Sequence, residues 1–182
     1  YDLGMRCFGE NRVQEALPKL EQLPSDIQWH LIGRLQSNKI NKVLGRFDLI
    51  HSIDSAELGR AVADRLEGRT QEILLEVNTS GEESKAGISP DQALECVRSW
   101  NGLSGLVLRG LMTVGPLTED REKRREAFRR LRELYEVFRS QGIGGDAFNI
   151  LSMGMSSDYE DAIELGSTHV RVGTALFGER QA

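Results

Sequence analysis

The chain has 182 residues, 39% of them hydrophobic and 28% charged, which is typical of one folded domain covering residues 1–182. Its 23 Lys and Arg residues against 28 Asp and Glu residues give a formal net charge of −5. This acidic balance disfavours nucleic acid and anionic membrane surfaces as partners.

Two further features of the composition bear on the cellular compartment. Cys7 and Cys96 are the only cysteines, and their spacing fits neither a disulfide framework nor a metal site. No apolar run reaches the roughly 18 residues that a membrane span requires. We therefore expect a cytoplasmic protein.

The first residues are typical of the interior of a longer fold. Tyr1 is not an initiator methionine, and Gly4 resembles a glycine that follows the last turn of a helix. We expect a strand and most of a helix to precede Tyr1.

Short apolar runs then alternate with longer amphipathic runs, which predicts βα units and a parallel sheet. The predicted strands are residues 7–10, 28–32, 49–53, 72–78, 107–112, 148–152 and 169–172. The predicted helices are residues 12–23, 38–44, 55–66, 90–100, 121–141 and 157–165. Ser55 and Ser157 are predicted to cap two of these helices, each with an acidic residue near the first turn.

This order of elements indicates the α/β class and a TIM-type (β/α)8 barrel. Seven strands are one short of eight, and the strand and partial helix expected before Tyr1 would complete the barrel. The alternative is a doubly wound open sheet, which usually has a glycine-rich turn after its first strand if it binds a dinucleotide. Residues 7–15 contain no such turn, so we predict the barrel, with its N-terminal first strand and most of its first helix outside this sequence.

Two loops near the C-terminus have the composition of a phosphate site, and the last two loops of such a barrel often hold phosphate. After strand 148–152, Gly154 permits a tight turn, and Ser156 and Ser157 offer hydroxyl and N–H groups at a helix start. After the last strand, Gly173 and Thr174 begin a short helix. Each group alone is explained by helix capping, but together they favour phosphate binding.

Arg171 lies within the last predicted strand. It either points into the mouth of the barrel or packs outward as a paired charge, because a buried arginine requires a partner. A ligand ring nitrogen is one such partner. Since arginine stays charged, it would keep a pyridine nitrogen unprotonated and weaken the ring as an electron sink.

Three other polar residues lie in or directly after strands. Lys85 is the only cation of its loop, and it either reaches a ligand phenolate or balances Glu82 and Glu83. Asn11 follows the first strand, where asparagine also serves purely local roles. His30 lies inside a strand, and such a histidine is more often a hydrogen-bonded core residue than a catalyst.

The one basic run, residues 121–132, has a nucleic-acid interpretation and a structural one. Pairing of Glu122 with Arg125, and of Glu126 with Arg129 and Arg130, favours an outer helix of the barrel. So does an apolar stripe at helical spacing, which consists of Ala127, Phe128, Leu131, Leu134, Tyr135 and Phe138.

Several catalytic motifs are absent from the sequence, namely HExxH, clustered His or Cys, GxSxG and GxxxxGK[ST]. Metal-dependent hydrolysis, serine hydrolysis and P-loop chemistry therefore lack support, and we expect no metal. The three histidines, His30, His51 and His169, lie on separate strands and meet only if the fold brings them together.

The chain closely resembles the pyridoxal phosphate homeostasis protein family over nearly its whole length. The motifs that carry the resemblance are FGENRVQEA, WHLIGRLQSNK, HSIDS, VNTSGEESKAGI, RGLMTVGP and LSMGMSSDYEDAIELGSTHVRVGTALFG. The resemblance implies a fold like the barrel domain of alanine racemase, pyridoxal 5'-phosphate as cofactor, and a role in vitamin B6 and amino-acid homeostasis. It implies a carrier or regulator, with unidentified cofactor-accepting proteins as partners; a racemase-like enzyme acting on amino acids is the alternative.

The resemblance assigns cofactor-binding roles to seven residues. Ser156, Gly173 and Thr174 match phosphate positions, Arg171 matches an arginine facing the pyridine nitrogen, Asn11 and Met155 match positions near the ring, and Lys85 falls near the ring hydroxyl. The family's Schiff-base lysine ends the first strand, which we expect before Tyr1, so no residue of this sequence is assigned that role.

Overall fold

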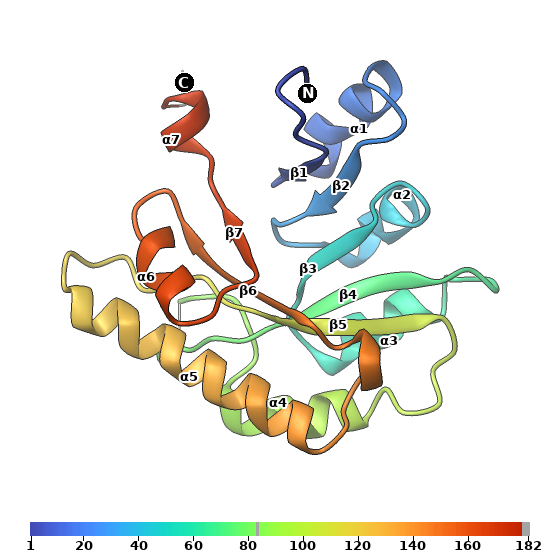
Figure 1. Cartoon of the computed structure of the whole chain (residues 1–182). Helices are drawn as coiled ribbons and strands as arrows, with labels where there is room; N and C mark the ends of the chain where they lie inside the picture. The colour runs from blue at the N-terminus through green and yellow to red at the C-terminus, as the bar shows by residue number, and fades with distance from the viewer. Residues whose placement is uncertain (83, 180–182) are drawn as a thin grey trace.

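The computed structural model describes residues 1–82 and 84–179, which form one sheet of seven parallel strands with helices outside it (Figure 1). The strands are β1 (Cys7–Glu10), β2 (Gln28–Leu31), β3 (Leu49–Ile53), β4 (Gln71–Glu76), β5 (Leu106–Met112), β6 (Ile150–Met155) and β7 (His169–Arg171). Neighbours in the sheet follow chain order from β1 to β7. Parallel strands in chain order with helical connections are the arrangement of a (β/α)8-type barrel, as the sequence predicts.

The helices cover the outer side of the curved sheet, and both termini lie at one side of the view, beyond β1 and β7 (Figure 1). The α-helices are α1 (Val13–Gln22), α2 (Ile40–Val43), α3 (Ala56–Ala63), α4 (Pro90–Arg98), α5 (Arg121–Ser140), α6 (Tyr159–Glu164) and α7 (Thr174–Phe177). Two 3-10 turns are η1 (Ser37–Lys39) and η2 (Gly145–Ala147). None of the helices in the described ranges is both long and apolar enough to cross a membrane.

The sheet curves until its two ends approach each other. His30 on β2 stacks against His169 on β7, with ring centroids 6.1 Å apart. In an open, gently twisted sheet these strands would be five positions apart, at a spacing of about 4.8 Å per strand. The contact therefore requires the barrel-like curvature that the sequence predicts.

Side chains that alternate along the strands divide the apolar core into two parts. A small cluster inside the barrel consists of Leu49, Leu74, Met112 and Ile150, from four neighbouring strands. The residues next to them belong to the larger cluster beneath the helices, for example Ile50, Ile73, Leu111 and Leu151. Because successive strand residues face opposite sides, this division identifies which positions of each strand point into the barrel.

Strand β6 differs most from the prediction, because it continues to Met155 where the sequence predicts an end at Ser152. Gly154 has a φ of 94° and lies in an irregular part of the β6–β7 pairing, so the predicted tight turn at this residue is wrong. A Cβ on Gly154 would lie 2.5 Å from Cβ of Ala162 on α6. The glycine therefore permits close approach of the helix to a bulged strand.

One predicted helix cap is confirmed and one is wrong. The hydroxyl of Ser55 accepts a hydrogen bond from the Leu58 N–H at 3.2 Å and begins α3. Asp158, not Ser157, precedes α6, and its carboxylate accepts the Met155 N–H at 2.6 Å. The local turn after β6 thus uses the carboxylate as its acceptor, and α6 begins two residues later than predicted.

Helix α5 packs on the barrel through its predicted apolar stripe. Phe128, Leu131 and Phe138 are completely buried. The predicted pairs of Glu126 are confirmed, but the pair of Glu122 with Arg125 is wrong. Arg125 instead contacts Asp161 of α6 at 2.8 Å, because the buried carboxylate of Asp161 requires a cationic partner. The basic side chains of α5 therefore join two outer helices of the barrel.

Candidate functional site

A layer of polar side chains lies inside the barrel beyond the small apolar cluster. His51, Glu76 and Ser152 each follow a residue of that cluster by two positions, so they point to the same inner side. Arg171 reaches this layer from β7. The layer lies toward the carboxyl ends of the strands, which is the end where barrels of this type bind ligands.

Arg171 points into the barrel and is held by neutral acceptors. Its Nη1 donates to Ser152 Oγ and its Nη2 donates to the Thr113 carbonyl oxygen, both at 2.8 Å. Burial lowers the pKa of Arg171 to about 10, an effect that Glu76 and Asp158 oppose. The guanidinium is still charged at neutral pH. Of the two orientations that the sequence leaves open, the structure has the inward one.

The two predicted phosphate loops meet at Ser156. Met155 pairs with Arg171 in the β6–β7 register, so the residues that follow the two strands emerge side by side. The Ser156 hydroxyl accepts hydrogen bonds from the Gly173 N–H at 3.1 Å and the Ala175 N–H at 3.3 Å. Thr174, the first residue of α7, lies exposed between them. Hydroxyl and N–H donors therefore gather at one point next to Arg171.

Lys85 connects the loops that follow β4 and β5. Its Nζ donates to the Gly115 carbonyl oxygen at 2.7 Å and lies 3.5 Å from the Glu82 carboxylate. Of the two predicted roles, the structure contains the balance of Glu82, whereas Glu83 lies outside the described residues. The loop connection keeps the Lys85 side chain at the ligand end of the barrel.

Asn11 lies apart from the other six predicted residues. It follows β1, at the edge of the sheet opposite β7, and is exposed. A Cβ on Gly33 would lie 2.1 Å from the Asn11 carbonyl oxygen, so the loops after β1 and β2 are in close contact. Among the described residues, no hydrogen bond joins the Asn11 side chain to the site around Arg171.

The fold brings the three histidines together. Their positions on separate strands did not by themselves predict this contact. His51 Nδ1 lies 3.1 Å from Ser152 Oγ, and His51 Nε2 lies 3.0 Å from His30 Nδ1. Burial, and then the charge of His169, lowers the pKa of His30 to about 4. Burial, with His30 and Arg171 nearby, holds the pKa of His51 well below its usual value. Both imidazoles are therefore neutral at physiological pH.

Glu76 is a second residue of this layer that sequence reasoning missed. It is only 5% exposed, and no group among the described residues hydrogen-bonds its carboxylate. Burial and the charge of Asp54 raise its pKa to about 7, against the opposing effects of Arg171 and Arg34. Glu76 lies two residues after Leu74, which points into the barrel, so the alternation of side chains along the strand could have identified it.

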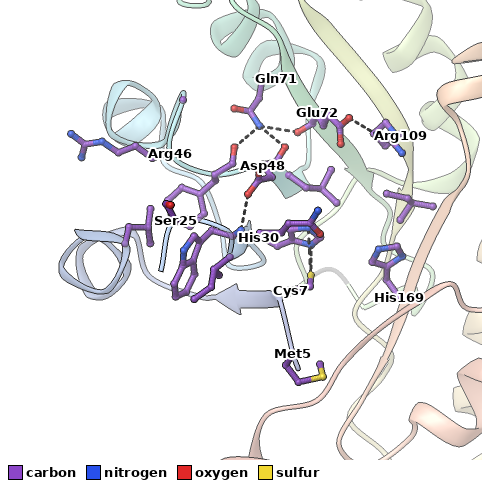
Figure 2. Close-up of a pocket in the computed structure, with 18 of the residues that line it drawn as sticks. Met5, Cys7, Ser25, His30, Arg46, Asp48, Gln71, Glu72, Arg109 and His169 are labelled. Atoms are coloured by element: carbon purple, nitrogen blue, oxygen red, sulfur yellow. Dashed lines mark hydrogen bonds and ion pairs between the residues drawn. The ribbon is translucent and has the colours of Figure 1, made fainter. Parts of the chain in front are cut away.

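A large cavity lies at the other end of the barrel. It has a volume of about 1300 Å³, and its lining includes residues at or directly before the starts of strands, such as Cys7, Asp48 and Gln71 (Figure 2). His30 and His169 border it from the barrel interior. None of the seven predicted cofactor residues lines this cavity. In the described ranges, no group of three or more His, Cys, Asp or Glu residues is placed to hold a metal ion.

Comparison with known proteins identifies the family. A profile of the family "Alanine racemase, N-terminal domain" matches residues 1–181. The pyridoxal phosphate homeostasis protein of Aquifex aeolicus is 45% identical over 185 residues, which cover all of this chain and 80% of that protein. The chain belongs to the pyridoxal phosphate homeostasis protein family. The Haemophilus influenzae protein of the same name is 39% identical over 99% of this chain and 78% of its own length.

Solved structures of related proteins have the same fold as this chain. PipY of Synechococcus elongatus without PLP has a TM-score of 0.91 and 38% identity, covering 98% of this chain and 84% of that chain. PipY with PLP bound has a TM-score of 0.86 with the same identity and coverage. Alanine racemase of Clostridium difficile has a TM-score of 0.82 at 14% identity, covering all of this chain and 49% of that chain, which shows the fold alone. The predicted barrel and the predicted family are both confirmed.

Proposed function

We propose that this protein binds pyridoxal 5'-phosphate at the carboxyl end of its barrel and acts as a carrier or regulator in vitamin B6 and amino-acid homeostasis. The observation that carries the proposal is the meeting of Ser156, Gly173 and Arg171 at two neighbouring strand ends. The PLP-bound structure of PipY supports it.

The loop that ends β6 and the start of α7 would hold the phosphate. Ser156 would supply a hydroxyl, and Gly173, Thr174 and Ala175 would supply backbone N–H groups at the start of a helix. The N–H groups of Gly173 and Ala175 donate to Ser156 Oγ in the structure, and a phosphate would share them with it or replace it as their acceptor. N–H groups at such a start favour an anion because they are not used within the helix. A Cβ at Gly173 would meet no atom within 4 Å, so this approach is open.

Arg171 would face the pyridine nitrogen of the bound cofactor. A guanidinium has five N–H donors, and two of those in Arg171 are used by Ser152 and Thr113. A further N–H can donate to an unprotonated ring nitrogen. Met155 and Asn11 would lie near the ring, and Lys85 near its hydroxyl.

The proposed role is carriage or regulation instead of turnover. Bound PLP supplies a reactive aldehyde and a ring that withdraws electrons most strongly when its nitrogen is protonated. A permanently charged arginine at that nitrogen keeps it unprotonated and so weakens this chemistry. A carrier of this kind would deliver the cofactor to accepting proteins.

Equilibrium dialysis with PLP and with unphosphorylated pyridoxal tests the binding site. We expect PLP to bind and pyridoxal to bind at least tenfold more weakly, since hydrogen bonds to a charged group each contribute about 1.5–3 kcal/mol. Ser156→Ala should weaken PLP binding about tenfold by the same reasoning. Ser25→Ala is the control and should bind normally, because Ser25 is exposed and lines the cavity at the amino end of the barrel, away from Ser156. Equal binding of PLP and pyridoxal would refute the proposed phosphate site.

Exchange of the α-proton of amino acids in deuterated water separates a carrier from a racemase-like enzyme. With PLP added, a carrier should give exchange no faster than free PLP does. Multiple turnovers of exchange that disappear in Ser156→Ala would instead establish the enzymatic alternative.

A further inference from the structure

Four side chains form a continuous hydrogen-bonded row through the interior of the barrel. Arg171 contacts Ser152, Ser152 contacts His51, and His51 contacts His30, at 2.8, 3.1 and 3.0 Å. We call these four residues the interior polar row. The row runs from the ligand end of the barrel toward the cavity at the amino ends of the strands, which His30 lines (Figure 2).

Arg171 determines the direction of the hydrogen bonds at Ser152. A guanidinium only donates, so Ser152 Oγ is the acceptor of the Arg171 bond. Ser152 is completely buried, and the other partner of its hydroxyl among the described residues is His51 Nδ1. If His51 also donated, the Ser152 hydroxyl hydrogen would lack an acceptor, at a cost of about 1–3 kcal/mol. Ser152 therefore donates to His51.

The direction of the hydrogen bond from Ser152 also determines which ring nitrogen is protonated in His51 and in His30. Because His51 Nδ1 accepts a hydrogen bond, its ring hydrogen is on Nε2. That N–H donates to His30 Nδ1, so the His30 ring hydrogen is also on Nε2. The Cys7 sulfur lies at nearly equal distances from His30 Nε2 and Nδ1, 3.6 and 3.7 Å, so it is aligned with neither ring nitrogen and does not decide the tautomer. Every donor in the row then points away from Arg171.

We propose that Ser152 and His51 are positioning residues that hold the Arg171 guanidinium at the mouth of the barrel, with His51 and His30 fixed as Nε2-protonated neutral imidazoles. The positioning of Arg171 toward a ring nitrogen rests on the PLP-binding function proposed above. The fixed tautomers and the immobilised guanidinium are properties of the protein without ligand.

Neutral groups, and not a carboxylate, hold the Arg171 guanidinium in place. Among the described residues, Arg171 forms no salt bridge with an N–O distance of 4.0 Å or less, although Glu76 shares the polar layer. The guanidinium is therefore oriented by two hydrogen bonds, to Ser152 and to the Thr113 carbonyl. The Thr113 carbonyl belongs to the backbone and cannot be removed by substitution, so only the hydrogen bond to Ser152 can be altered. His51 determines which way the hydroxyl of Ser152 points.

Nitrogen-15 NMR of the ligand-free protein tests the tautomers. Two-bond correlations from the ring hydrogens distinguish an Nε2-protonated imidazole from an Nδ1-protonated one. We expect His51 and His30 both to be Nε2-protonated at neutral pH. A His51 ring protonated on Nδ1, or a mixture of tautomers, would overturn the proposed direction of the row.

Two substitutions of His51 test whether the row positions Arg171. His51→Asn retains an acceptor near the Nδ1 position, whereas His51→Leu removes it with a side chain of similar volume. In the ligand-free wild type and in His51→Asn, slow rotation of an anchored guanidinium should give separate Nη signals for Arg171. In His51→Leu these signals should merge. His169→Asn is the control, because His169 stacks on His30 but, in the described part of the chain, its ring is hydrogen-bonded to Thr168 and not to the row.

PLP binding by the same variants gives the functional result. We expect His51→Leu to bind PLP about tenfold more weakly, as the loss of one hydrogen bond predicts, and His51→Asn to bind within threefold of wild type. Separate Arg171 signals in folded His51→Leu would overturn the positioning role whether or not PLP binds. Failure of the wild type to bind PLP, with merged signals in His51→Leu, would overturn the proposed function and leave the anchor established.

Discussion

Replacement of Glu76 by glutamine is expected to change how stability depends on pH. Glu76 is 5% exposed, and burial followed by the charge of Asp54 raises the pKa of its carboxyl from 4.5 to about 7. At about 1.36 kcal/mol per pH unit, this difference corresponds to about 3 kcal/mol of folding free energy. Between these two pH values the unfolded chain releases a proton that the folded chain retains. The wild type therefore loses up to about 3 kcal/mol of stability from this group as the pH rises from 4.5 through 7.

The assay is urea unfolding of wild type and Glu76→Gln at several pH values from 4.5 to about 8. Glutamine stays neutral in both states, so the variant should gain about 3 kcal/mol relative to wild type across this range. The difference between the two proteins is the quantity to compare, because His30 also titrates in acid. Glu95→Gln, an exposed change on α4, is the matched control and should show no such trend. Parallel pH profiles for wild type and Glu76→Gln would refute the reasoning.

Two further predictions concern the barrel interior. Gly110→Ala should destabilise the protein by about 3 kcal/mol in urea unfolding, because its Cβ would lie 1.7 Å from the Ile150 carbonyl oxygen. Gly102→Ala, with φ of 86° but no atom within 4 Å, should cost only about 1 kcal/mol, and equal costs would contradict the steric argument. The contribution of His30 has the opposite sign to that of Glu76: it should fall as the pH drops from 6.5 toward 4, since folded His30 resists protonation that the unfolded chain accepts. Relative to wild type, His30→Asn should therefore gain up to about 3 kcal/mol as the pH drops through this range, and a pH-independent difference between the two proteins would exclude a neutral buried His30.

Most of the barrel could be predicted from the sequence because local pattern and fold agree along most strands. The runs at 7–10 and 49–53 are strands with the predicted bounds. Strand β6 could not be predicted in full, because Gly154 signals a turn by composition but occupies a bulge that allows α6 to approach. For α5, the sequence predicted only ion pairs between residues of the same helix. Arg125 pairs across to Asp161, a contact that depends on the packing of two helices.

The residues of the candidate site that lie in neighbouring loops could be predicted from the sequence. The residues that lie inside the barrel were harder to predict. Ser156 and Gly173 follow adjacent strands, so the barrel topology alone brings them together. The contact of His30 with His51 depends on which strand positions face inward. That assignment requires the register, because a shift by one residue turns a side chain to the opposite side. The cofactor roles of the seven residues stay predictions.

The partners of buried polar groups distinguish the two ends of the barrel better than cavity volume does. At the amino end, Arg109 donates to Glu72 and to two further oxygens, and the Gln71 amide donates to three carbonyl oxygens. At the carboxyl end, Arg171 uses two of its five N–H groups and the Glu76 carboxylate has no hydrogen-bond partner among the described residues. Arg171 is mostly buried and still has N–H groups free to donate, so a ligand acceptor can bind there. By this reasoning the large cavity at the amino end is the weaker candidate, and a ligand with both phosphate and ring-nitrogen acceptors fits the end that holds Arg171.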